Sequence, residues 1–500
     1  MQLRLWRKKA LALSLDLTAI WALSLTLCGV ASAEDDLDDL MGGFDDDFDA
    51  SEIGSHDEEI HPWLAALPFG DVLAERVDLS GSLSSGVVYN YRPHSVTHGD
   101  DPTRRTNYGN LSRLDLDGFL QLDVQLPSDW QIRAEALGWY DFVYRAKGRG
   151  NYGGAVIDVY EWQVDSGEVY ITGPLSKEID LTIGRKIVNW GRSDTFRIVD
   201  VVNPLDNKEP GLVDIEDLRR PRIMLKLDAS TGPWSGTALV IPERRYDRLP
   251  PPGGEFFPDL AKLPPVFRSI PIDNDGHGDF ERMPDFAAKF GGSFRSWDFT
   301  FYGAYLDEYS RVTDTTASGS LQAKGNRFGL FGAAGNYTVA SWLFKIETAF
   351  LTDLHVLRVR GNPQRLESDN ADRFDTMLGV EYFGPDNLMI ALEVVNRHFV
   401  GSTNDIVFAN LQTEQSRFET ALRISRPFFR ERLDITLLGL AFGERFHQGG
   451  FVRVSGDFEL TDSWLLTGGL LAFFGGSNDD DVVGDFDSND RLFMEIKYSF

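Results

Sequence analysis

The carboxy-terminal segment of the chain alternates apolar and polar side chains at every second position. Within residues 491–500, one face carries Leu492, Met494, Ile496, Tyr498 and Phe500, and the other face is mostly polar. A strand with an apolar face, a mostly polar face and an aromatic last residue is typical of a membrane-spanning barrel. An ordinary edge strand of a soluble sheet has the same pattern over one segment, so the rest of the chain must decide.

The same alternation recurs from residue 76 to the end, and the connections distinguish the two readings. Short turns alternate with long polar segments, whereas a soluble sandwich gives no such regular order. The long segments are residues 92–110, 146–155, 190–219, 244–283, 311–321, 354–370, 399–414 and 475–490. Tryptophans stand beside the short turns, where an interfacial girdle belongs: Trp130, Trp297, Trp342 and Trp464. This arrangement predicts an outer-membrane barrel with short periplasmic turns and long outer loops.

The sequence therefore predicts an all-β fold, a closed antiparallel transmembrane β-barrel of about 18 strands, with about 16 as the alternative. The expected strands are residues 76–91, 111–126, 130–145, 156–172, 178–189, 220–230, 233–243, 284–294, 296–310, 322–338, 340–353, 371–384, 387–398, 415–426, 432–444, 449–460, 463–474 and 490–500. An even number places both chain ends in the periplasm. A barrel of this size is wide enough for an aqueous lumen.

Residues 1–33 are expected to be a secretory signal peptide. Arg4, Arg7, Lys8 and Lys9 precede a long apolar run, and Ala31-Ser32-Ala33 is a small-residue cleavage pattern. Cleavage after Ala33 would remove Cys28, the one cysteine, and would exclude disulfides. A membrane-spanning leader and a lipidated Cys28 are the alternatives, and no other run is apolar and long enough for a helical span.

Residues 34–61 contain 13 acidic residues and no basic ones. Such a segment cannot bury enough apolar surface to offset its ordering entropy, so we expect a disordered acidic tail in the periplasm. A second reading is a short motif that folds onto a periplasmic partner through its apolar residues. Those residues are Leu37, Leu40, Met41, Phe44 and Phe48. Residues 62–75 are expected to form a short amphipathic helix or a plug at the barrel mouth, and residues 76–500 the barrel.

The formal net charge of −28 excludes one class of partner. A nucleic-acid binder needs a basic surface, so no nucleic acid is expected. The partners expected are outer-membrane lipid and lipopolysaccharide, the barrel-assembly machinery through Phe500, and a periplasmic or exporter component through the acidic tail. The expected location is the outer membrane of a Gram-negative bacterium.

The densest motif lies where the strand expected at 178–189 becomes a long loop. It reads Ile-Gly-Arg-Lys-Ile-Val-Asn-Trp-Gly-Arg-Ser-Asp over 183–194 and Val-Val-Asn-Pro-Leu-Asp over 201–206. This resembles a large family of Gram-negative outer-membrane barrels of unassigned substrate, marked by Gly-Arg, Asn-Trp-Gly and Asn-Pro-x-Asp, and is distantly similar to exopolysaccharide-export barrels. The resemblance covers nearly all of the expected mature chain. It implies movement of hydrophobic or organic compounds, beside an inner-membrane exporter of the resistance-nodulation-division type.

The motif and the loop that follows supply the candidate site residues. They are Arg185, Asn189, Trp190, Arg192, Asp194, Asn203, Asp206, Arg219 and Arg220. A loop of such mixed charge that folds inward would form a constriction whose transverse field selects solutes. The alternative is a loop held together by its own ion pairs, which braces the wall.

Arg185 presents a problem of register. If Ile183 faces lipid, strict alternation turns Arg185 outward too, and a charge on the lipid face is costly. Either a bulge at Gly184 turns Arg185 inward, or Arg185 lies at the headgroups.

Catalytic chemistry has little support in the sequence. The eight His residues lack metal-ligand spacing on one element, and no Gly-x-Ser-x-Gly motif occurs. A barrel lipase with distant Ser and His residues is the enzymatic alternative. We therefore expect no enzyme activity, no metal and no cofactor. The sequence favours a channel that passes or exports organic, hydrophobic or amphipathic solutes, and the alternative is a non-transporting structural or adhesive barrel.

Overall fold

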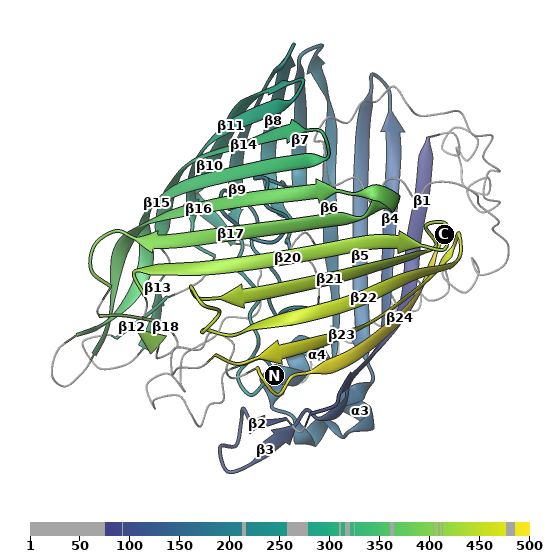
Figure 1. Ribbon diagram of the computed structural model, residues 1–500, viewed down its shortest axis with the longest axis vertical. Helices are drawn as coiled ribbons and strands as arrows, with labels where there is room; N and C mark the ends of the chain where they lie inside the picture. Colours follow the sequence, from purple (N-terminus) through teal and green to yellow (C-terminus); the bar gives the residue numbers. More distant parts are fainter. Residues whose placement is uncertain are drawn as a thin grey trace, which may run out of the picture. The chain divides into compact units, whose positions relative to one another are not determined.

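The first barrel strand pairs along both of its edges, and this closes the sheet. In the computed structural model, β1 (Val77–Asn90) is antiparallel to both β4 (Asn110–Leu126) and β24 (Arg491–Ser499). The result is a closed antiparallel barrel of 18 strands, in which neighbours in sequence are neighbours in the sheet (Figure 1). The predicted fold class and strand number are confirmed.

The structure describes residues 76–92, 94–212, 217–257, 279–309, 312–315, 321–324, 326–360, 365–403, 405–408, 411–412, 414–476 and 486–500. The signal peptide 1–33, the acidic tail 34–61 with Leu37, Leu40, Met41, Phe44 and Phe48, and the segment 62–75 lie outside the described residues. The predictions for those segments stay predictions.

The remaining barrel strands follow in chain order. They are β5 (Trp130–Asp141), β6 (Trp162–Ser176), β7 (Ile179–Lys186), β8 (Arg222–Thr231), β9 (Trp234–Arg244), β10 (Asp279–Phe294), β11 (Trp297–Asp307), β14 (Arg327–Val339), β15 (Trp342–Arg360), β16 (Arg365–Phe383), β17 (Met389–Phe399), β20 (Ser416–Phe428), β21 (Leu433–Phe442), β22 (Gly450–Thr461) and β23 (Trp464–Phe474). Short elements lie in the long connections: β2 (Ser95–Thr97), β3 (Arg105–Asn107), α3 (Val143–Ala146), η2 (Arg149–Asn151), α4 (Gly154–Tyr160), β12 (Val312–Thr315), β13 (Leu321–Lys324), β18 (Ile406–Phe408) and β19 (Leu411–Gln412); η4 (Pro385–Asn387) forms the short turn before β17. None of the helices within these described ranges is long and apolar enough to cross a membrane.

Several predicted boundaries are wrong. The strands expected to end at 145 and to begin at 156 give way to α3 and α4, because apolar side chains at helical spacing pack together there, among them Tyr144, Val156 and Tyr160. The strand expected from 322 is divided, since β13 pairs with β12 rather than continuing β14. The loop expected at 354–370 is largely strand, because β15 and β16 stay paired to Arg360 and Arg365.

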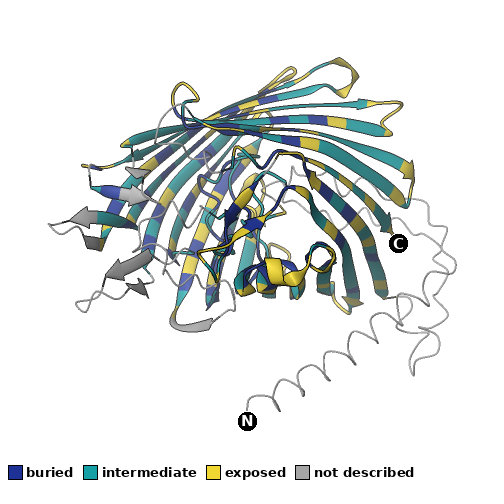
Figure 2. Ribbon diagram, turned by 90° about the horizontal axis from the view of Figure 1, so that it is seen from below, coloured by how far each residue is buried: buried dark blue, intermediate teal, exposed yellow. Residues whose placement is uncertain are grey.

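The two faces of each strand have opposite environments. Leu330 is 0% exposed and the next residue, Phe331, is 68% exposed; Met377 and Leu378 are 0% and 59% exposed. Buried and exposed positions alternate along the strands in Figure 2. Large apolar side chains on the exposed outer face need a lipid environment, as the sequence pattern predicts.

The inner face, which the sequence predicts to be mostly polar, also carries a large apolar patch. Strands β8 to β20 contribute a continuous set of buried apolar side chains. These are Met224, Leu239, Ile241, Ala287, Tyr302, Leu306, Phe328, Leu330, Ala334, Ala349, Leu351, Met377, Val395 and Ala421. Water does not cover this patch, because the loop between β7 and β8 lies on it.

Candidate functional site

The loop that joins β7 to β8, residues 187–221, begins as an inward-folded segment that we call the inner finger, residues 188–202. Its apolar side chains belong to the same buried cluster as the inner wall. They are Val188, Trp190, Phe196, Ile198, Val199 and Val202. Burial of this apolar surface holds the finger against the wall.

The tip of the inner finger reaches the end of the barrel that carries the short turns. The Arg192 guanidinium lies 2.8 Å from a carboxylate oxygen of Asp298, one residue after the start of β11. Asp194 lies 2.9 Å from Lys345 Nζ, near the start of β15. Both ion pairs therefore fix the tip deep in the lumen. Arg192 and Asp194 keep about a third of their side-chain surface exposed.

Two buried carboxylates on the wall bind the backbone of the finger tip. Glu347 on β15 accepts hydrogen bonds from the N–H groups of Arg192 and, at 2.7 Å, Ser193. Glu393 on β17 accepts from the Ser193 hydroxyl at 2.7 Å and the Asp194 N–H at 3.0 Å. Donors from the finger thus satisfy acids that would otherwise be costly to bury.

Neither glutamate is among the site residues predicted from the sequence. Each one occupies an inward position that alternation alone reveals, but nothing in the sequence identifies the loop amides as its partners.

Asn203 joins the two ends of the loop. Its side-chain oxygen accepts from the Val188 N–H at 2.9 Å, and its side-chain nitrogen donates to the Arg220 carbonyl at 2.8 Å. Asn203 is fully buried. The asparagine of the Asn-Pro-x-Asp motif is therefore a clamp between the end of β7 and the start of β8.

The other predicted residues of the loop lie nearer the long-loop end. Arg219 pairs with Asp200 at 2.9 Å, within the loop. Asp206 pairs with Lys208 at 3.4 Å and with Arg248, after β9, at 3.2 Å. These contacts lie within the loop and with the segment after β9, whereas Arg192 and Asp194 pair with strands of the barrel wall.

Arg185, Asn189 and Trp190 have three different environments. β7 keeps its register through Gly184 and Arg185 with both neighbouring strands, so no extra residue is inserted there, but Gly184 has a φ of +138°, outside ordinary strand geometry. Arg185 forms an ion pair at 2.5 Å with Glu243, which is buried. Trp190 is buried with its ring centroid 5.4 Å from that of Tyr302, and Asn189 is exposed.

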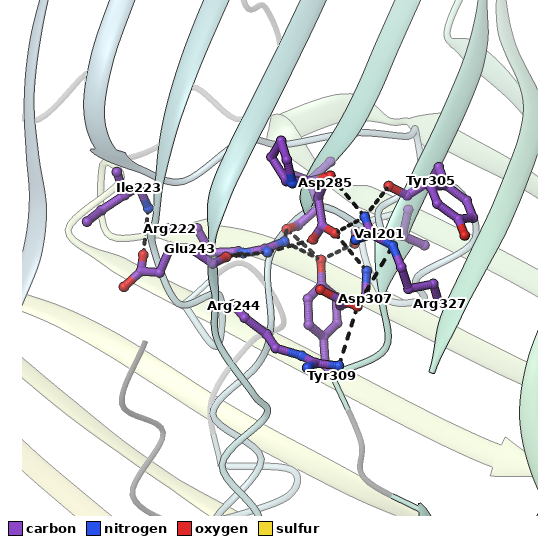
Figure 3. Close-up of polar contacts among 12 residues, drawn as sticks. Val201, Arg222, Ile223, Glu243, Arg244, Asp285, Tyr305, Asp307, Tyr309 and Arg327 are labelled. Atoms are coloured by element: carbon purple, nitrogen blue, oxygen red, sulfur yellow. Dashed lines mark hydrogen bonds and ion pairs between the residues drawn. The ribbon is translucent and has the colours of Figure 1, made fainter. Parts of the chain in front are cut away.

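A buried charge network fixes the return of the loop to the wall (Figure 3). Arg222 on β8 donates to Asp285 on β10 at 2.7 Å, and Arg327 on β14 donates to the other oxygen of Asp285 at 2.7 Å. Tyr309 donates its hydroxyl to the carbonyl of Val202, at the end of the inner finger, at 2.6 Å. Three strands and the loop are thereby connected through one carboxylate and one phenol.

A cavity of about 290 Å³ lies beside the second half of the loop. Its lining comes from β4, β5, the last residue of α4, β6, the segment after β9, and the loop itself. Arg220 is the predicted residue most affected by this setting. Burial, followed by the nearby Arg248 and Arg245, lowers its pKa to about 9.

The site therefore brings together Arg192 and Asp194 at the finger tip, and Asp206, Arg219 and Arg220 at the cavity. Arg185 and Asn189 belong to neither group. Within the described ranges, no group of three or more His, Cys, Asp or Glu residues is arranged to hold a metal ion.

Residues 18–500 match the model of a protein family described as "Protein of unknown function (DUF1302)". No curated protein sequence matches the chain. Similar solved structures include Acinetobacter baumannii OccAB1, with a TM-score of 0.48, 9% identity and coverage of 85% of this chain and 96% of that chain. For Pseudomonas aeruginosa OccK8 (OprE), the TM-score is 0.47 and the identity is 7%, and the match covers 85% of this chain and 98% of that chain. For Salmonella typhi OmpF in complex with daunomycin, the TM-score is 0.41 and the identity is 9%, and the match covers 85% of this chain and 97% of that chain. At these identities the likeness concerns the barrel fold alone.

Proposed function

The chain belongs to the DUF1302 family, and we propose that it is an outer-membrane channel of a Gram-negative bacterium that passes or exports organic, hydrophobic or amphipathic solutes. The observation that carries the proposal is the inner finger, a segment with a charged tip that lies inside a closed barrel. An apolar outer face and partly exposed charges inside are what a membrane-embedded wall around an aqueous path requires.

The inner surface supports the amphipathic character of the solute. The cavity beside the loop is lined by charged side chains together with Trp139 and Leu137. A solute with both apolar and charged parts finds complementary groups for each part on this path.

The proposed partners are assigned from the position of the two ends of the barrel sheet. β1 begins beside the end of β4, and β24 ends beside β1, at the short-turn end that faces the periplasm in this proposal. The acidic tail 34–61 precedes β1 and is proposed to contact a periplasmic or exporter component. Phe500 is proposed to be recognised by the barrel-assembly machinery.

A second candidate function, a non-transporting structural or adhesive barrel, is favoured by one observation. The same loop that packs on β15 also reaches β22, where Arg453 donates to the carbonyl of Leu212 at 3.0 Å. A loop in contact with two separate parts of the wall would suit a plug.

Uptake into liposomes tests the proposal. Purified protein is reconstituted, and entry of labelled lipids, sterols, aromatics and sugars is measured against empty liposomes. Entry of amphipathic or hydrophobic solutes supports the channel. If no class of solute enters, the result supports a non-transporting structural or adhesive barrel instead. The Arg192→Ala variant should shift ion selectivity towards cations, because it removes a partly exposed positive charge from the constriction.

A further inference from the structure

The cavity beside the loop has opposite charge on its two sides. The side formed by the loop, the start of β6 and the segment after β9 carries five cations and three carboxylates among the described lining residues. The side formed by β4 and the adjoining end of β5, with Glu209 of the loop, carries four carboxylates and one guanidinium. This separation of charge produces an electric field across the cavity. A loop that only blocks the lumen would not require such a field.

The positive side is a cluster of arginines around few acids. Arg245 and Arg248 both donate to Asp165, at 3.2 and 2.7 Å. Arg248 reaches Asp206 as well. Burial, and after it the positive charges of Arg248 and Arg245, lower the pKa of Arg220. An oxyanion accepts several guanidinium hydrogen bonds at once, so it suits this side.

The negative side centres on Arg113 of β4, which three carboxylates approach. Arg113 pairs with Asp115, with Glu209 at 3.2 Å and with Asp117 at 4.0 Å. Asp117 and Glu209 keep 29% and 27% of their side-chain surface exposed. The Oδ2 atom of Asp117 is buried and has no hydrogen-bond partner among the described residues. A cationic donor at the exposed part of this carboxylate would balance its charge.

An apolar strip separates the two charged sides. Trp139 and Leu137, both on β5, belong to the lining. Lys208 lies over the Trp139 ring, with its Nζ 4.4 Å from the ring centroid. A short aliphatic or aromatic spacer between two charges would lie on this strip.

We propose that this cavity binds a dipolar organic solute. Its ammonium-type cation lies at Asp117 and Glu209, its carboxylate or phosphate lies at Arg248 and Lys208, and its apolar spacer lies on Trp139. The inference rests on the proposed function and deepens it, since it assigns a zwitterionic head to the amphipathic solute. The volume of about 290 Å³ suits a small molecule or the head of a larger one.

Three probes of equal chain length test the proposal on the full mature protein in detergent: ε-aminocaproate, caproate and hexylamine. Titration calorimetry should give a Kd for ε-aminocaproate at least about tenfold below that of either singly charged probe. Because both contacts are ionic, the preference should shrink as salt is added. Equal binding of all three probes, or no binding of ε-aminocaproate, overturns the proposal.

Variants on each side assign the two charges. Asp117→Asn should weaken ε-aminocaproate about tenfold and leave caproate unchanged, because it removes the site of the cation. Arg248→Gln should weaken ε-aminocaproate and caproate and leave hexylamine unchanged. Asp180→Asn, which removes a strand carboxylate of β7 outside the cavity lining, is the matched control and should leave all three affinities unchanged.

The use of two variants keeps the test valid if one of them fails to fold. Arg248 has several buried contacts, so its substitution can unfold the loop, whereas Asp117 is partly exposed and its substitution keeps the test decisive. If Asp117→Asn binds ε-aminocaproate as tightly as the unaltered protein, the proposal is wrong. Binding without liposome uptake would contradict the channel alone, and uptake without preferential binding would contradict the dipolar site alone.

Discussion

Arg222 and Asp285 form an ion pair at 2.7 Å in which each side chain is 1% exposed. Asp285 also accepts from Arg327, and Arg222 donates to the Val202 carbonyl at 3.2 Å. A pair this deeply buried is held in place by its surroundings, and removal of one partner leaves an uncompensated charge. The pair therefore links the position of the inner finger to the integrity of the wall.

Asp285→Asn should destabilise the barrel by about 3–5 kcal/mol, because Arg222 and Arg327 then lose a buried counter-charge. Urea unfolding in detergent, followed by tryptophan fluorescence, measures the change. The matched control is Asp386→Asn, which breaks an ion pair of the same 2.7 Å length with Arg426 whose side chains are 75% and 42% exposed. The control should cost about 0–1 kcal/mol. Equal losses in the two variants would show that burial does not set the strength of the pair.

Asn203→Ala should loosen the loop and leave the barrel intact. The substitution leaves the Val188 N–H and the Arg220 carbonyl without their buried partner, at a cost of about 1–3 kcal/mol. Amide exchange at Val188 should become faster, while exchange in β15 and β16 stays slow. Asn189→Ala, at an exposed position in the same motif, should change neither. Unaltered exchange at Val188 in Asn203→Ala would disprove the clamp.

A disulfide can test whether the inner finger moves. A Cβ atom at Gly332 would lie 2.5 Å from Cγ1 of Val199, so the pair Val199→Cys and Gly332→Cys is close enough to bridge. Oxidation should leave single-channel conductance unchanged, because the finger is packed by apolar burial and two glutamates in its working position. The single variants are the controls. A large change in conductance on reduction would mean that the finger moves during transport.

Asp247 should make the loop sensitive to pH. Its carboxylate accepts from the Leu205 N–H at 2.7 Å, and burial raises its pKa above the usual range. The folded state therefore favours the neutral form. This stabilisation is complete below the pKa of an unfolded aspartate, about 3.9, and is lost as the pH rises through the raised folded value.

The protection factor of the Leu205 amide, corrected for intrinsic exchange, should thus fall as the pH rises through this interval. Asp247→Asn keeps a side-chain oxygen that accepts the hydrogen bond and cannot ionise, so its profile should be flat. The same slope in both proteins would exclude Asp247 as the titrating group.

The barrel was predictable from the sequence because alternation has a period of two and one face must meet lipid. Every predicted strand has a counterpart, and Trp297 and Trp342 begin strands after short turns, as expected. The ends of β5 and β6 were not predictable. There, helical spacing around Tyr144 and Tyr160 competes with strand pairing, and only the packing of distant loops decides.

The motif indicated where the site lies but not how it is built. Alternation marks Glu347 and Glu393 as inward residues, yet their partners are amides about 150 to 200 positions away in the sequence. The same limit applies to Arg248, which lies in a long connection, residues 244–283, that the sequence marks only by its length and polarity. Arg185 shows the opposite case, since the sequence exposed the problem and the ion pair with Glu243 resolves it.

The most direct test of the channel is conductance in planar bilayers, with and without the inner finger. Because Asn203 holds Val188 close, a short glycine linker can replace residues 189–201 without stretching the chain. The unaltered protein should show discrete openings, and the variant without the finger should show larger ones, since the constriction is gone. Equal conductance, or no openings in either protein, would contradict a channel that this segment narrows.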